Sequence, residues 1–285
     1  MAALTARRRL FWRDPGVLPG FGLSLGFTIF YLSVIVLIPL TALALRPWEH
    51  GVHGILKTLS EPRVLASLRL SFGAAALAAG INAVMGLIVT WVLVRQDFPG
   101  RKIVDALVDL PFALPTAVAG IALTTIYGPH GPLGELFARV GIKTAYSPLG
   151  VVIALAFVGL PFVVRTLQPV MQDMRRDVEE AAETLGANAI QRAVRIILPA
   201  IAPALITGTG LAFARAVGEY GSVIFIAGNM PMVSEISPLL IVIKLEQYDY
   251  AGAATVGLAM LGLSFGVLLV FNLIQLWLSS RGKVR

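Results

Sequence analysis

The sequence is poor in charged residues. Only 14% of its 285 residues are charged and 57% are hydrophobic, and the mean hydropathy is +0.82. A soluble domain has about 25% charged residues and about 45 to 50% apolar residues. This chain therefore has too few charges to cover a surface that faces water. The composition excludes a soluble protein and leaves no room for a large domain outside a membrane.

Cysteine is absent and histidine is rare, with His50, His53 and His130 alone. Disulfides, thiolate zinc sites and cysteine nucleophiles are thereby excluded. His50 and His53 have an HxxH spacing, but no further ligand lies near them, so we expect no metal site. The net charge of +7 is spread between apolar runs, whereas a nucleic-acid protein gathers basic and aromatic residues on one soluble face. We expect no cofactor in this chain and no nucleic-acid partner.

Long stretches without Asp, Glu, Lys or Arg are what the sequence has in abundance. A transmembrane helix needs about 20 mostly apolar residues to cross about 30 Å of hydrocarbon. Six stretches qualify, at residues 15–45, 70–94, 110–134, 144–164, 196–214 and 250–280. The first begins near Gly22 and is too long for a cleaved signal peptide. We expect the fifth to continue past Arg215 and Glu219 into 221–228. The sequence predicts an all-α membrane protein with six transmembrane helices.

The basic residues predict the orientation. With the N-terminus inside, the inner segments carry 15 Lys and Arg residues and the outer segments carry 7, and Arg215 lies within a span. Basic residues concentrate in cytoplasmic loops, so both termini are expected in the cytoplasm and the chain in the inner membrane. The predicted organisation is a basic segment over 1–20, a single transmembrane domain over 21–280 in contact with lipid, and a cytoplasmic tail over 281–285.

The inner loop at 172–199 has the pattern of two short helices. Val178, Ala181, Ala182 and Leu185 recur with the spacing of one apolar helix face, and Gly186 is a typical helix stop.

The second short helix is marked by its own start signal. Asn188, with Gln191 three residues later, resembles a capping box, and we expect Pro199 to break the apolar pattern that follows. One interpretation is a hairpin that lies on lipid headgroups. The other is a docking site for a protein partner, which the acidic residues of the loop favour.

The same loop resembles the EAA loop of ABC importer permeases, the inner-membrane components of binding-protein-dependent transport. The segment EAAETLGANAIQRAVRIILP matches that loop at Glu180, Ala181, Ala182, Gly186, Ile196, Leu198 and Pro199. The resemblance implies the fold of a type I importer permease, with a coupling helix in a cleft of a separate ATP-binding subunit. It implies that Glu180 pairs with a basic residue of that ATPase and that Gly186 makes the turn between the two short helices.

Four further stretches narrow the resemblance to the T-type (or U-type) subunit of sulfate and thiosulfate permeases. They are DLPFALPTAVAGIAL at 109–123, PFVVRTLQPV at 161–170, ARAVGEYGSVIFIAGN at 214–229 and LEQYDYAGAA at 245–254. The resemblance implies a heterodimer with a W-type permease, a dimeric ATP-binding subunit that holds ATP and Mg, and a periplasmic sulfate-binding protein. No GxxxxGK[ST] phosphate loop occurs, so the chain is not an ATPase itself.

Other functions remain open at this point. Molybdate or tungstate permeases share some of these segments, and such a permease could be a homodimer. A secondary anion transporter would need inverted repeats and its own ion-coupling site, and no clear repeat is present. An intramembrane enzyme would need a nucleophile paired with a base, and the apolar runs offer no such pair.

Charged side chains within the spans are the first candidates for a site. Counting about 1.5 Å per residue places Arg215 past the middle of the fifth span, where a charge should face the bundle interior or a wet cavity. One interpretation is an ion pair with Glu219 that rigidifies the helix. The other places Arg215 on the anion path, hydrogen-bonded to oxyanion oxygens and restrained by Glu219. Arg165 and Gln168, near the inner end of the fourth span, are expected to reach toward the headgroups. The alternative is that they line the cytoplasmic mouth of the path.

The third span contains the second candidate. Pro111 and Pro115 each remove a backbone donor, so the helix should be kinked or interrupted near Leu114. A half-helix that begins at Pro115 or Thr116 would aim its positive N-terminus into the bundle, toward an anion. The alternative is a kink whose free groups are satisfied by neighbouring helices.

Overall fold

The computed structural model describes residues 21–282, with the side chains of Arg176 and of 277–282 left aside. The predicted segment 1–20 and residues 283–285 of the predicted tail lie outside the described residues. All regular secondary structure within 21–282 is helical, which confirms the predicted all-α fold. The chain divides into two compact units, 1–46 and 47–285, and each is described by itself.

The first unit is a broken apolar helix. It consists of α1 (Phe21–Leu32), the π-helical turn η1 (Ser33–Leu37) and α2 (Ile38–Leu45). The π turn lies directly before Pro39, which has no N–H for a regular helix, and the Ile38 N–H bonds the Ser33 carbonyl instead. No residue of these elements is buried. Their apolar side chains are thus available to lipid.

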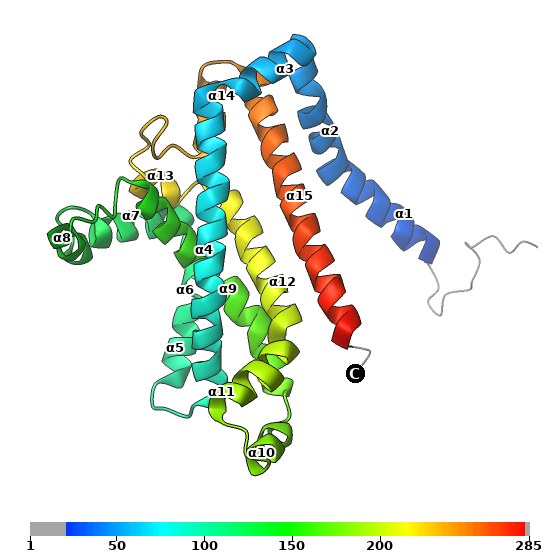
Figure 1. The fold of residues 1–285 in the computed structure, drawn as a ribbon. Coiled ribbons are helices and arrows are strands. Elements are labelled where there is room, and N and C mark those ends of the chain that lie inside the picture. Colours follow the sequence, from blue (N-terminus) through cyan, green and yellow to red (C-terminus); the bar gives the residue numbers. More distant parts are fainter. Residues whose placement is uncertain (1–20, 283–285) are drawn as a thin grey trace, which may run out of the picture. The chain divides into compact units, whose positions relative to one another are not determined.

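The second unit contains the remaining elements (Figure 1). They are η2 (Arg46–His50, shared with the first unit), α3 (Gly51–Ser60), α4 (Pro62–Arg95), α5 (Arg101–Val108), α6 (Leu110–Ala113), α7 (Thr116–Tyr127), α8 (Pro132–Arg139), α9 (Pro148–Asp173), α10 (Arg176–Thr184), α11 (Ala189–Arg192), η3 (Ala193–Ile197), α12 (Leu198–Val217), α13 (Val223–Ile226), α14 (Ser237–Glu246) and α15 (Tyr250–Gly282). Figure 1 shows α10 and α11 at one end of the long helices, and α3 and α14 at the other.

The core of this unit lies between α4, α9, α12 and α15. Helix α4 packs against α9 and α12, and α12 packs against α15. Small residues allow the close approach, since a Cβ on Gly86 of α4 would lie 2.7 Å from Val163 Cγ1 of α9. A Cβ on Gly208 of α12 would likewise lie 3.0 Å from Val163 Cα. Close packing of backbones over small residues is typical of membrane helices, where lipid offers no hydrophobic drive for association.

Five of the six predicted spans are long apolar helical runs. These runs are Phe21–Ser60, Pro62–Arg95, Pro148–Asp173, Ala189–Val217 and Tyr250–Leu276. The predicted third span, 110–134, is divided between α6 and α7 and ends in the first residues of α8. Helix α7 has 12 residues, or about 18 Å at 1.5 Å per residue, and is too short to cross a bilayer alone.

Two predictions about the fifth span are wrong. Pro199 does not end the preceding helix, because the π turn η3 precedes it and Leu198 N–H bonds Ala193 O, so the helical run continues through Pro199. The span also does not continue past Glu219. Helix α12 ends at Val217, and Gly218 begins an irregular stretch before α13. Glu219 therefore lies just beyond the helix end.

Ion pairs hold the end of the bundle that contains α14. Lys244 of α14 is nearly buried, and its Nζ lies 3.0 Å from Asp249 Oδ2 and 3.6 Å from Glu61 Oε2. Burial raises the pKa of Asp249, but the hydrogen bonds from the Gly252 N–H and Lys244, with the positive charges of Lys244 and His50, bring that pKa below its usual value. The junction between α14 and α15 is thus stabilised when Asp249 is ionised.

Candidate functional site

Arg215 and Glu219 form the predicted i, i+4 ion pair. Arg215 Nη1 lies 2.6 Å from Glu219 Oε2. The other carboxylate oxygen, Oε1, accepts hydrogen bonds from Ser222 N–H and Ser222 Oγ, each at 2.9 Å. The Glu219 side chain is 2% exposed and that of Arg215 is 34% exposed. The carboxylate is fully engaged, whereas the guanidinium has further N–H groups that reach no acceptor within the described residues.

The predicted interruption of the third span is present. Helix α6 ends at Ala113, Leu114 and Pro115 have extended backbones, and α7 begins at Thr116. Pro115 accepts the first α7 hydrogen bond through its carbonyl, from the Ala119 N–H. The N–H groups of the first turn have no partners within the helix. The start of α7 therefore presents the positive end of a helix dipole within the chain's apolar region.

The structure brings these two candidates together. A Cβ on Gly221 would lie 2.2 Å from Thr116 Oγ1, so the backbone two residues after Glu219 rests directly on the start of α7. A Cβ on Gly120 of α7 would lie 2.4 Å from Ser222 O. Thr116 is half-buried at this contact, and Pro115 is exposed. The break in the third span therefore contacts the stretch after Glu219, and the two contacts are made at Gly120 and Gly221, which are about 100 residues apart in sequence.

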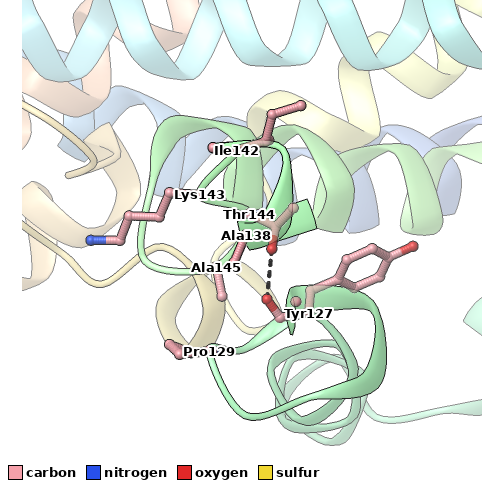
Figure 2. A pocket seen from close by; sticks show the side chains of 9 residues that line it. Tyr127, Pro129, Ala138, Ile142, Lys143, Thr144 and Ala145 are labelled. Carbon is pink, nitrogen blue, oxygen red and sulfur yellow. Dashed lines mark hydrogen bonds between the residues drawn. The ribbon is translucent and has the colours of Figure 1, made fainter. Parts of the chain in front are cut away.

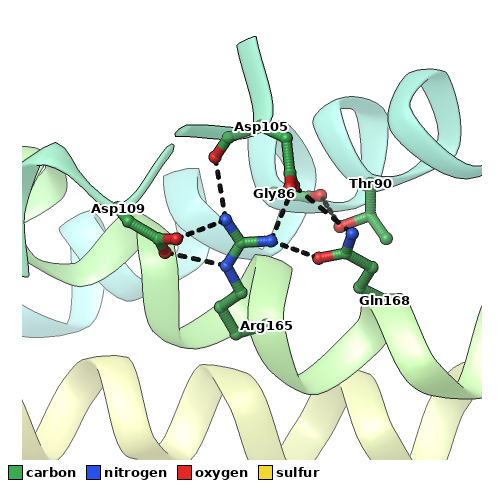
Figure 3. A network of polar contacts seen from close by, with 6 residues as sticks. All are labelled: Gly86, Thr90, Asp105, Asp109, Arg165 and Gln168. Atoms are coloured by element: carbon green, nitrogen blue, oxygen red, sulfur yellow. Dashed lines mark hydrogen bonds and ion pairs between the residues drawn. The ribbon is translucent and has the colours of Figure 1, made fainter. Parts of the chain in front are cut away.

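Arg165 is the centre of a second charged cluster, shown in Figure 3. Its Nε and Nη2 donate to Asp109 Oδ1 and Oδ2 at 2.8 and 2.6 Å. Its Nη1 donates to Asp105 Oδ1 at 2.6 Å and to Gln168 Oε1, and Nη2 also donates to Asp105 O at 2.8 Å. All five N–H donors are used. Arg165, which was predicted to reach toward the headgroups, has its guanidinium held by two carboxylates of the neighbouring segment.

The two carboxylates of this cluster, Asp105 and Asp109, were not predicted from the sequence. Asp105 lies on α5 and Asp109 joins α5 to α6, while Arg165 lies on α9. Their spacing of four residues puts both carboxylates on one helix face, which is the signal that could have identified them. The cluster fixes the segment before the α6–α7 break to the central helix α9.

The loop at 172–199 has the two predicted helices, α10 and α11. Gly186 has a φ of +86°. Its N–H bonds Glu183 O, and Ala187 N–H bonds Ala182 O, which is the helix ending that favours glycine. The predicted capping box of Asn188 and Gln191 is present. The predicted turn at Gly186 is thus confirmed.

The residues of the EAA pattern fall on both parts of this loop. Glu180 and Ala181 are exposed on α10, and Ala182 is half-buried. Ile196 lies in the π turn, and Leu198 and Pro199 open α12, where both are exposed. The pattern therefore runs from an exposed short helix into the transmembrane helix that carries Arg215.

A small pocket lies beside the end of α7 (Figure 2). It has a volume of about 240 Å³ and is lined by Tyr127, Pro129, Gly134, Ala138, Gly141, Ile142, Lys143, Thr144 and Ala145. Thr144 Oγ1 donates to Tyr127 O at 2.7 Å, and the Lys143 side chain extends away from that bond. Within the described residues, no group of three or more His, Cys, Asp or Glu side chains could hold a metal ion.

Comparison with known proteins identifies the family. Residues 82–284 match the family described as "binding-protein-dependent transport system inner membrane component". The chain is 48% identical over 250 residues to the sulfate transport system permease protein CysT of Synechocystis sp., with 88% of this chain and 87% of that one covered. It is 41% identical over 275 residues to the CysT of Escherichia coli, with 96% of each covered.

Solved structures have the same fold. A chain of a bacterial alginate ABC transporter, in complex with an alginate-bound periplasmic protein, aligns with a TM-score of 0.73 at 15% identity and covers 88% of this chain and 92% of its own. A chain of the MetNI methionine ABC transporter aligns with a TM-score of 0.54, with 75% and 94% covered. In such importers ATP hydrolysis belongs to a separate subunit, and a periplasmic protein supplies the substrate. This chain belongs to the binding-protein-dependent transport system inner membrane component family, the multi-pass inner-membrane subunits of ABC importers.

Proposed function

We propose that this chain is the transmembrane subunit of an importer that moves sulfate or thiosulfate into the cell, driven by ATP. The observation that carries the proposal is the 48% identity, over 88% of the chain, to a permease whose name specifies sulfate. Its partners are a homologous W-type permease, a dimeric ATPase that binds ATP and Mg, and a periplasmic sulfate-binding protein. Both termini and the 172–199 loop face the cytoplasm, and the chain has no catalytic residue of its own.

The anion path in this proposal passes Arg215. The Arg215 side chain is one-third exposed, and its guanidinium pairs with Glu219 through Nη1. The other N–H groups are available to oxyanion oxygens, which guanidinium binds with short, charge-assisted hydrogen bonds. Glu219 restrains the arginine because Ser222 holds its second oxygen. Thr116, with Pro115 before it, contributes the positive end of α7 beside the same stretch.

Coupling to the ATPase in this proposal runs through the EAA residues. Glu180 is exposed on α10, where a basic residue of the ATPase can reach it. The small side chains of Ala181 and Ala182 allow α10 to enter a cleft of the ATPase. Gly186 makes the turn to α11. Ile196, Leu198 and Pro199 continue the helical run into α12.

Uptake of labelled sulfate by cells that lack their own sulfate importer tests the proposal. Cells that express the chain with its partner subunits should accumulate sulfate, and Arg215→Ala should abolish accumulation. Arg139→Ala is the matched control, since Arg139 is exposed at the end of α8 and should transport normally. Normal uptake by Arg215→Ala would refute the path. Uptake that molybdate suppresses far more strongly than unlabelled sulfate does would assign the chain to molybdate instead.

A further inference from the structure

Helix α10 connects to two different transmembrane helices through two of its glutamates. Glu179 forms an ion pair with Arg95, the last residue of α4. Glu183, one turn further along α10, forms an ion pair with Arg192, the last residue of α11. Residues four apart lie on one helix face. The face of α10 that carries these pairs is therefore distinct from Glu180, which is one position away and exposed.

The pair between Glu179 and Arg95 is well enclosed. The two side chains are 18% and 9% exposed, and the Arg95 guanidinium lies 5.8 Å from the centre of the Trp91 ring, a distance typical of a cation–π contact. The pair is made by Arg95 Nη2, and Arg95 Nε is buried without a hydrogen-bond partner. An exposed ion pair has little effect on stability, but removal of one partner from an enclosed pair leaves a desolvated charge.

Side-chain bonds are what join α10 to the rest of the unit. Among the described helices, α10 packs on α11, and Figure 1 shows it beyond the end of the bundle. Its link to α4 is the Arg95–Glu179 pair. Helix α11 runs without a break into α12, so the Glu183–Arg192 pair connects α10 with the helix that ends beside Arg215.

We infer that Glu179 and Glu183 are positioning residues that transmit a displacement of α10 to α4 and to α12 respectively. This inference rests on the proposed function, in which the ATPase moves α10 through Glu180. The two ion pairs lie on one face of α10, so helices α4 and α12 move together with α10. The far end of α12, with Arg215 and Glu219, then shifts relative to the start of α7. The Glu179–Arg95 pair is the more enclosed of the two ion pairs, and it is the one tested.

The experiment uses the complete complex in proteoliposomes, with its ATPase and the periplasmic binding protein. Sulfate uptake and ATP hydrolysis are measured in parallel for Glu179→Gln, Arg95→Gln and Arg95→Lys. Arg175→Gln is the matched control, because Arg175 and Asp177 pair within the same loop with side chains that are 79% and 55% exposed. Glu179→Gln should retain ATP hydrolysis but move at least about fivefold less sulfate per ATP, the lower end of usual coupling between sites.

Recovery of coupling by compensating variants distinguishes a specific role of the Glu179–Arg95 pair from a general loss of stability. Arg95→Lys keeps the charge and should fall between wild type and Arg95→Gln. The reversed pair, Arg95→Glu with Glu179→Arg, should recover much of the lost coupling. The inference would be overturned if Glu179→Gln moved as much sulfate per ATP as wild type. It would also be overturned if the reversed pair and the control Arg175→Gln lost the same amount of sulfate transport per ATP. If Arg95→Gln does not assemble, Glu179→Gln decides alone.

A second measurement does not depend on the transported anion. Because the chain has no cysteine, cysteines introduced at the exposed Leu185 and Val84 can carry spin labels next to α10 and on α4. In the wild-type complex, ATP should leave the distance between these labels unchanged, since the two helices move together. In Glu179→Gln, ATP should shift or broaden it, and an unchanged distance would overturn the inference. A wild-type complex that moves no sulfate, yet shows the ATP effect in the variant, would contradict the proposed function alone.

Discussion

Gly120→Ala is expected to push Ser222, in the stretch after α12, away from α7. The added Cβ would lie 2.4 Å from Ser222 O, 2.8 Å from Ser222 Cα and 3.0 Å from its carbonyl carbon. These are backbone atoms, so no rotamer change relieves the clash. An ordinary contact begins at about 3.4 Å, so Ser222 must move by about 1 Å. Overpacking of this kind costs about 1 to 3 kcal/mol.

A matched glycine removes the helix-propensity term from this estimate. Gly80 lies in α4, and a Cβ there would meet nothing within 4 Å. Alanine is favoured over glycine in a helix by about 0.5 to 1 kcal/mol, and this gain applies to both positions. The difference between Gly120→Ala and Gly80→Ala should therefore be the overpacking cost alone, about 1 to 3 kcal/mol.

Unfolding in mixed detergent micelles, followed by circular dichroism, measures this difference. Gly120→Ala should unfold at lower denaturant than Gly80→Ala, and its sulfate uptake should fall because Ser222 holds Glu219. Equal stability and equal uptake in the two variants would refute the close contact between α7 and the stretch after α12.

Three further predictions follow from the charged side chains. Glu180→Lys should leave the chain folded but separate ATP hydrolysis from transport, and unchanged uptake in proteoliposomes would contradict its role. Arg165→Leu removes five hydrogen bonds to Asp105, Asp109 and Gln168, whereas Arg101→Leu removes one bond to the exposed Asp97, so the midpoint of unfolding in detergent should be lower for Arg165→Leu than for Arg101→Leu. The pKa of Asp249 is lower when folded than unfolded, so its stabilising contribution is present above about pH 4 and is lost as the pH falls through the folded pKa; acid unfolding of Asp249→Asn should be less steep than that of wild type.

The sequence predicted the membrane class and most helices because composition and run length determine them directly. Five apolar runs long enough to span a bilayer are long helices. The break near Leu114 was also predictable, since Pro115 excludes a regular helix there. The capping box and Gly186 placed the two short helices of the 172–199 loop because their signals are local.

Features that depend on distant contacts were not predictable in the same way. Pro199 was expected to end a helix, but it follows the π turn η3, in which the Leu198 N–H bonds the Ala193 carbonyl, and the helical run continues. Arg165 was expected to reach outward, but its guanidinium is bound by Asp105 and Asp109, which lie more than 50 residues away in sequence. The meeting of Thr116 with Gly221 depends on how α7 packs on the end of α12. Helical periodicity contains no information on such pairings.

ATP-driven uptake of labelled sulfate by proteoliposomes that contain the complete complex tests the central claim most directly. The account predicts that the wild-type complex accumulates sulfate and that Arg215→Ala loses about tenfold or more of this uptake, since a hydrogen bond to a charged group contributes about 1.5 to 3 kcal/mol. Arg139→Ala should accumulate sulfate normally. A wild-type complex that hydrolyses ATP and accumulates molybdate but no sulfate, or an Arg215→Ala complex with full sulfate uptake, would contradict the account.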